Sequence, residues 1–196
     1  LPCPSASSHC KRNFLRSFDG LLAAVTLAGL AFVAPAVHAA SYTWTPLTAG
    51  PFNWNNANSQ NNWTSGFPNA LADVANMSVN LSANQTVNLN QAITLGTLTI
   101  GDNNGAQTFT LAPNSGSLIF DVSSGTASLN RSSAGTGATT VSSNITLNDN
   151  LAVRLASGTA SSTMTLSGII SESGGAKSLT KDSGTLTLAL TGSNTF

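Results

Sequence analysis

Two aspartates in this sequence could work together in acid–base chemistry. Asp102 and Asp121 are separated by close to one coil of a stacked β-fold, which would place them on the same side. Enzymes that cleave glycosidic bonds need two carboxylates at a set separation, so the pair is a candidate site for a polysaccharide lyase or glycosidase. The simpler interpretation is structural, because aspartates in turns cap backbone amides. We favour that interpretation and assign no catalytic residue.

Histidine and cysteine occur only near the N-terminus, at Cys3, His9, Cys10 and His38. If that segment is removed from the mature chain, Ser-His-Asp and Cys-His catalysis are excluded for the remainder. A zinc site lacks its usual ligands there, and no disulfide can form. We therefore expect no metal and no cofactor, and we interpret the protein as one that is not an enzyme.

Charge is scarce in this chain, at 7% of the 196 residues with a formal net charge of zero. In soluble proteins, about a quarter of the residues are charged on average. Such a composition excludes a nucleic-acid binder, which needs a basic face, and a coiled coil, which needs charged flanking positions. The turn aspartates Asp102, Asp149 and Asp182 could hold Ca²⁺, but the glycine–aspartate repeat of calcium-binding β-rolls is absent.

The N-terminal segment has the order of a secretory signal peptide. Lys11, Arg12 and Arg16 precede the apolar run 21–33, and small residues follow up to Ala39. Cleavage after Ala39 fits signal peptidase, and the apolar run is too short for a comfortable membrane span. We therefore expect residues 1–39 to be a signal peptide and the mature protein, without a transmembrane span, to be secreted or displayed outside the cell.

Short apolar–polar alternations dominate the chain from residue 74. Runs such as 86–90, 145–147 and 186–190 are bounded by Gly, Asn, Ser and Asp, which is typical of strands and turns. No window after the signal peptide shows helical spacing. Many short strands with few aromatic residues favour a β-solenoid over a sandwich or a barrel. We therefore predict an all-β solenoid over residues 74–196.

Residues 40–73 differ from the rest because they hold all three tryptophans, Trp44, Trp54 and Trp63, among many asparagines. Prolines interrupt any regular element there, so we expect an irregular segment with a few short strands. The three rings could stack on sugars in a carbohydrate-binding module. We favour the alternative that they cap the apolar end of the solenoid.

A Thr-apolar-Thr-apolar phrase starts at Thr97, Thr108, Thr163 and Thr185. The interval from Thr163 to Thr185 is twice that from Thr97 to Thr108, which suggests a loose repeat unit as long as the shorter interval or its double. Stacked threonines on a flat face could bind ice, but alternation of inward leucine with outward threonine explains the phrase equally well. The irregular intervals favour the second interpretation.

The C-terminal residues resemble the autotransporter-associated β-strand repeat (passenger-associated transport repeat). The residues that carry the resemblance are Leu179, Thr180, Lys181, Gly184, Thr185, Leu186, Thr187, Leu188, Gly192, Asn194, Thr195 and Phe196. Here the glycine after the lysine is replaced by Asp182 or missing, and an aromatic phenylalanine replaces the usual tyrosine. The upstream Trp- and Asn-containing segment is similar to the regions that precede such repeats.

The resemblance implies a right-handed parallel β-helix in a surface protein of a Gram-negative bacterium. It also implies a further C-terminal translocator or sorting segment, so we expect the chain to be the N-terminal fragment of a longer protein. The function we expect is structural or adhesive, with extracellular carbohydrate or a host or neighbouring cell surface as partner. A β-helix polysaccharide-active enzyme and a carbohydrate-binding module remain the alternatives.

Overall fold

The structure is a computed structural model that describes residues 39–56, 62–132, 135–156, 161–182 and 185–196. The chain divides into two units, Leu1–Pro35 and Ala36–Phe196, and all described residues belong to the second. The signal peptide expected over residues 1–39 therefore lies outside the described residues, except for its last position. Within the described part, no helix is long and apolar enough to span a membrane.

The described residues form three sheets of parallel strands. The first sheet contains, in order, β1 (Ser41–Thr43), β3 (Val74–Val79), β6 (Thr97–Asp102), β9 (Ala127–Arg131), β12 (Leu151–Leu155) and β15 (Leu179–Lys181). The second sheet contains β2 (Phe52–Asn53), β4 (Gln85–Leu89), β7 (Phe109–Pro113), β10 (Thr139–Val141), β13 (Ser162–Leu166) and β16 (Leu186–Leu190). The third sheet contains β5 (Ile93–Leu95), β8 (Leu118–Phe120), β11 (Ile145–Leu147) and β14 (Ile170–Glu172).

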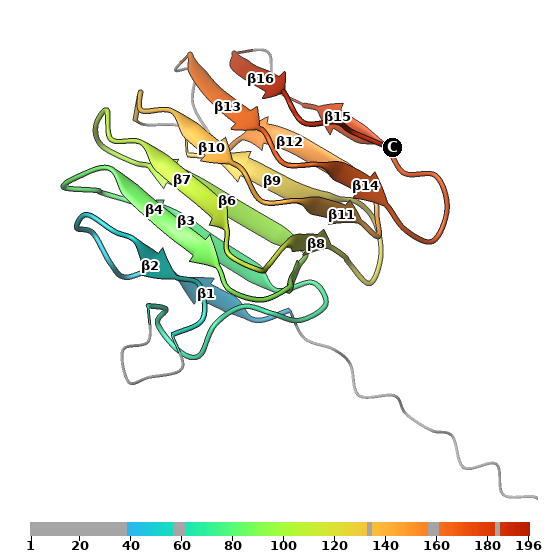
Figure 1. Cartoon of the computed structure of the whole chain (residues 1–196), viewed down its shortest axis with the longest axis horizontal. Coiled ribbons are helices and arrows are strands. Elements are labelled where there is room, and N and C mark those ends of the chain that lie inside the picture. The colour runs from blue at the N-terminus through green and yellow to red at the C-terminus, as the bar shows by residue number, and fades with distance from the viewer. Residues whose placement is uncertain (1–38, 57–61, 133–134, 157–160, 183–184) are drawn as a thin grey trace, which may run out of the picture. The chain divides into compact units, whose positions relative to one another are not determined.

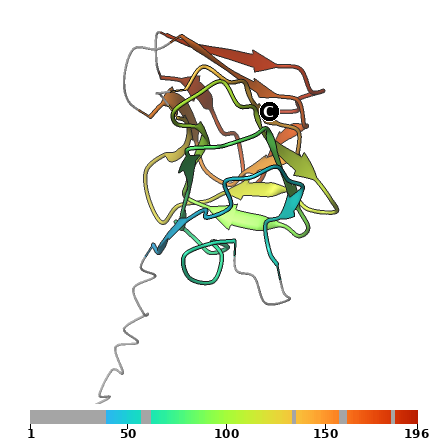
Figure 2. The same cartoon turned by 90° about the vertical axis from the view of Figure 1, so that its left-hand side faces the viewer.

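The chain passes through the three sheets in turn, so each complete coil contributes one strand to each sheet. Figures 1 and 2 show the strands stacked in sequence order, from blue β1 at one end to red β16 at the other. Each strand pairs in parallel with its equivalent in the next coil, as β3 does with β6 and β6 with β9. The prediction of an all-β solenoid is therefore confirmed.

The coil is close to the longer of the two units that the threonine phrases suggest, and its length varies along the stack. Val74 lies opposite Thr97, and Thr97 lies opposite Ser128, so the second of these two coils is the longer. The shorter of the two expected units was wrong because three strands, with their corners, make up one coil. The extra residues of the longer coil lie mainly in the corner between β8 and β9, so the strands themselves stay in register.

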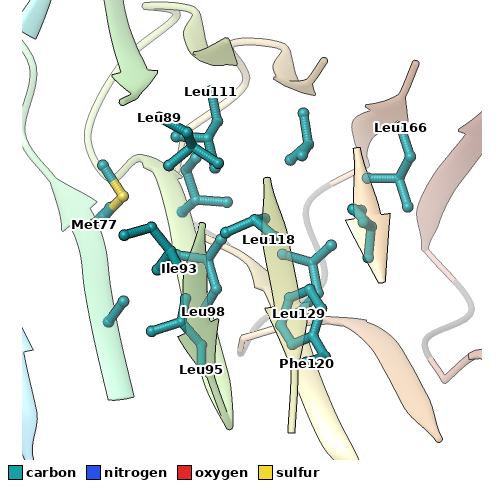
Figure 3. Packing of buried hydrophobic residues seen from close by; sticks show 14 of the residues in the cluster. Met77, Leu89, Ile93, Leu95, Leu98, Leu111, Leu118, Phe120, Leu129 and Leu166 are labelled. Carbon is teal, nitrogen blue, oxygen red and sulfur yellow. The ribbon is translucent and has the colours of Figure 1, made fainter. Parts of the chain in front are cut away.

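Alternation along each strand directs one set of side chains into a single continuous core. Figure 3 shows leucines, Ile93 and Phe120 from successive coils converging in the interior. Leu98, Leu129 and Val153 occupy equivalent positions in three consecutive coils, and all are fully buried. Burial of each such side chain stabilises the fold by about 2 kcal/mol before entropy is counted.

Asparagines at the corners join one coil to the next, which accounts for their abundance. The side-chain oxygen of Asn84 accepts the backbone N–H of Thr108 at 2.9 Å. Asn144 accepts the N–H of Ile169 at 3.0 Å, and Asn194 accepts that of Ile170 at 2.9 Å. These bonds supply acceptors where the backbone enters a strand and its N–H groups would otherwise lack a partner.

Candidate functional surface

The three tryptophans are buried together at the N-terminal end of the stack. Trp44 follows β1 and Trp54 follows β2, and both belong to the same buried cluster as the leucines of the core. Trp63 lies against both, with ring centroids 5.1 Å from Trp44 and 4.6 Å from Trp54. The exposed fractions are 1%, 0% and 2%, so no ring face is open to a sugar in this conformation.

Each indole N–H of this tryptophan cluster is also bonded inside the protein. Trp44 donates to the side-chain oxygen of Gln85 at 2.7 Å, and Trp54 donates to the carbonyl of Pro68 at 3.1 Å. Trp63 donates to the carbonyl of Trp54 at 2.9 Å. Buried indoles with satisfied donors pack as part of a core, and these three rings extend that core at the end of the stack that holds β1 and β2.

The structure does not bring Asp102 and Asp121 together. Asp102 ends β6, whereas Asp121 donates its backbone N–H to Leu95, just before β6 begins. Asp121 thus lies near the start of β6 and Asp102 at its end, so their backbones are roughly 17–20 Å apart for a strand of this length. Glycosidase pairs are about 5 to 10 Å apart, so these two residues do not form such a pair.

Asp102 is buried and holds the corner after β6. Its two oxygens accept the backbone N–H groups of Leu81, Asn104 and Gln107 at 3.0, 3.4 and 3.1 Å. With 1% of its surface exposed, it has no access to a substrate. Asp121 is half-buried, and one of its oxygens accepts a hydrogen bond from the side-chain amide of Asn148 at 2.9 Å.

Two other aspartates also accept backbone N–H groups, whereas Asp182 does not follow this pattern. Asp73 accepts the backbone N–H groups of Ala40 and Asn69, and Asp149 accepts that of Val122. Asp182, which the sequence placed among possible calcium ligands, lies 3.6 Å from Arg154 in an exposed ion pair. The described residues contain no group of three or more potential metal ligands, and no pocket is hollowed into them.

Arg131 is a buried charge that the sequence did not single out. It stands at the end of β9 in the inward row that holds Ile100 in the preceding coil, and it is fully buried. Its guanidinium donates to the carbonyls of Ser132, Gly135 and Gly137 and so closes the corner before β10. Burial lowers the pKa of Arg131, and the charge of Asp102 partly opposes that shift.

The residues of the C-terminal repeat motif form the last described coil. Leu179, Thr180 and Lys181 make β15, and Leu186, Thr187 and Leu188 belong to β16. Thr195 bridges to Ser171 of the preceding coil. Phe196 is 41% exposed, and Gly184 lies outside the described residues.

The outer face of the second sheet carries an ordered array of threonines. Thr86, Thr110, Thr140 and Thr165 lie directly opposite one another in successive coils, followed by Ala189. Two flanking rows lie two positions before and two positions after these residues, within the strands or close beside their ends, and all ten are at least partly exposed. They are Asn84, Thr108, Ala138, Thr163 and Thr187, and Asn88, Ala112, Ser142, Ser167 and Thr191. We call these fifteen positions the threonine face.

The threonine face contains no charged and no aromatic residue, and all of its positions are at least partly exposed. Sequence reasoning considered a stacked threonine array but did not favour it, because the intervals between its threonines are unequal. The stretch from Thr110 to Thr140 is longer than the stretch from Thr140 to Thr165. Only the strand register shows that the unequal lengths are absorbed in corners.

No family model matches this chain, and no curated protein or solved structure matches it. Its geometry is therefore the guide to its function. That geometry combines a continuous parallel core, corners held by buried polar groups and an uncharged outer face.

Proposed function

We propose that this protein is a secreted or cell-surface β-solenoid with a structural or adhesive role and without catalytic activity. The observation that carries the proposal is the use of its polar groups. Asp73, Asp102 and Asp149 all accept backbone N–H groups at corners, and Arg131 closes another corner. Side chains committed in this way stabilise a rigid rod. They leave the outer faces of the sheets to meet a partner.

We propose export from the cell because of the sequence of residues 1–39 and the resemblance of the last coil to the autotransporter-associated repeat. A passenger of that kind reaches the outer surface of a Gram-negative bacterium and presents stacked coils to its surroundings. The proposal accordingly includes export, removal of residues 1–39 and display of the solenoid on the outer surface or its release.

The test is expression of the full chain in a Gram-negative host, followed by fractionation and mass spectrometry of the N-terminus. We expect Ala40 to be the first residue of the exported protein. Ala39→Lys places a long charged side chain where signal peptidase needs a small one, so it should leave the precursor uncut. A full-length chain that remains in the cytoplasm and is never cut would refute the export part of the proposal.

The adhesive part has a separate test. Beads coated with the purified chain should bind to bacterial or host cells more than beads coated with unfolded chain, because the outer faces exist only in the stacked form. Equal binding by folded and unfolded chain would contradict adhesion through the solenoid surface. Polysaccharide cleavage that Asp121→Asn abolishes would instead support the enzyme.

A further inference from the structure

The threonine face is a regular lattice rather than a scatter of polar residues. Its central row places four threonines in register, one per coil, from β4 through β7 and β10 to β13. Neighbouring coils are about 4.8 Å apart, and successive outward side chains on one strand are about 6.7 Å apart. The face therefore repeats in two directions, and Figure 1 shows its strands lying one above another.

The backbone beneath this lattice is held firmly. The inward neighbours of the central row, such as Phe109, Leu111 and Val141, have no exposed surface. Threonine itself is stiff because its side chain branches at Cβ. Few degrees of freedom are lost when such a surface binds an ordered partner, which favours affinity.

The chemistry of the face is neutral, with hydroxyl and methyl groups side by side. Eight of its fifteen residues are threonines, and none of their hydroxyls is hydrogen-bonded within the part of the chain that the structure describes. A charged partner such as nucleic acid, an anionic membrane or an acidic polysaccharide would find no opposite charge here. A flexible glycan would find no aromatic ring to stack on.

The size of the face weighs against a second copy as its partner. Fifteen positions on five strands cover roughly 300–500 Å² from the strand spacings. Stable protein interfaces bury about 800 Å² on each partner. A partner that is itself a rigid, neutral, hydrogen-bonding lattice with repeats of a few ångström fits these properties better.

We propose that the threonine face binds the surface of ice crystals. The hydroxyls bond to water molecules of the lattice, and the methyl groups between them occupy the gaps that ordered water leaves. Binding at many points at once compensates for the weakness of each contact. This activity belongs to the solenoid surface, so it holds whether or not the export proposed above is correct.

The experiment measures recrystallisation of ice in frozen sucrose containing the purified full chain. We expect the wild-type chain to arrest crystal growth. Thr140→Lys puts a charge at the centre of the face, where contact with ice would desolvate it without a partner. Thr140→Lys should therefore raise the protein concentration needed to arrest crystal growth by roughly tenfold or more.

The matched control is Thr146→Lys. Thr146 is the central, half-buried outward residue of β11, as Thr140 is of β10, but it lies on the third sheet. It should leave the activity unchanged. Circular dichroism checks that both variants fold, and Thr110→Lys replaces Thr140→Lys if the latter does not.

Three results would overturn the proposal. The first is crystal growth with the wild-type chain at the rate of buffer alone, and the second is equal loss of activity in Thr146→Lys. The third is a different occupant of the face. A dimer in sedimentation that Thr140→Lys dissociates would assign the face to a second copy. Retention on chitin or cellulose that the same variant abolishes, without ice activity, would assign it to a neutral polysaccharide.

Discussion

Arg131 shows how one residue holds a whole corner. Its guanidinium donates to three carbonyls of the corner between β9 and β10, in a position where the neighbouring coils place apolar side chains. Arg131→Ala leaves those buried carbonyls without donors and opens a cavity. We expect a loss of about 3 kcal/mol in the free energy of unfolding, measured by urea titration.

Arg154→Ala is the control for this loss. Arg154 is 40% exposed, and its partner Asp182 is 61% exposed, so their ion pair is screened by water. Its removal should change the free energy of unfolding by no more than about 0.5 kcal/mol. Similar losses in the two variants would mean that the buried corner bonds are not what makes Arg131 important.

The alternation of the sequence contained part of this information. Leu98, Ile100 and Asp102 share one phase of β6, and Leu129 and Arg131 share one phase of β9. Phase alone therefore places both charged residues inside. Their charge predicts the opposite, an exposed position, because burial of an unpaired charge is costly. The carbonyl partners that resolve the conflict come from a corner whose path the local sequence does not specify.

A second prediction about a single residue concerns the tryptophan cluster. Trp54 is fully buried, packs on Trp63 and donates its indole N–H to Pro68. Trp54→Ala should reduce the free energy of unfolding by about 3–5 kcal/mol. Phe196→Ala, at a side chain that is 41% exposed, should change it by less than about 1 kcal/mol in the same titration. A stable, folded Trp54→Ala variant that has lost sugar affinity would favour the carbohydrate-binding module instead.

At the scale of elements, close contact between coils depends on a glycine at the turn before the third sheet. A Cβ added to Gly168 would lie 2.1 Å from the carbonyl oxygen of Ser143 in the preceding coil. The added Cβ would be fixed to the backbone of one coil, and the oxygen belongs to the backbone of the other. The clash can therefore be relieved only by separating the two coils. We expect Gly168→Ala to destabilise the fold by about 3 kcal/mol, measured by thermal or urea unfolding.

Gly174→Ala separates this steric effect from the general cost of replacing glycine. Gly174 has a φ of +73°, but no described atom lies near the position of an added Cβ. Its replacement should cost only about 1 kcal/mol, the strain of a left-handed backbone. A Gly168→Ala variant no less stable than Gly174→Ala would show that the coils can separate at little cost.

The strands themselves were the most predictable elements. Alternation predicted strands at 86–90, 145–147 and 186–190, and β4, β11 and β16 lie there to within one residue because each has one inward and one outward face. How the strands combine into coils was less predictable, since corner lengths vary between coils without changing the register. The threonine face was hard to predict for the same reason, because its rows form only when the strands of successive coils are paired.

For the whole molecule, stacking makes stability depend on neighbouring coils. Each interior strand of the second sheet pairs on both sides, as β7 does with β4 and β10, whereas β16 ends the described stack and pairs with β13. In such a one-dimensional stack, opening starts at coils that have one neighbour. The opposite end is different, because the buried tryptophan cluster packs there beside β1 and β2.

Hydrogen exchange followed by mass spectrometry should therefore give a gradient along the stack. Amides of β7 and β10 should exchange slowest, and those of β15 and β16 fastest, because an end coil can detach without disturbing the core beneath it. Trp54→Ala should accelerate exchange in β3 and β4, which pair with β1 and β2 beside the tryptophan cluster, and leave the distant β13 unchanged. Uniform exchange from β3 to β16 would instead show that the stack opens as a single unit and that its coils are not independent layers.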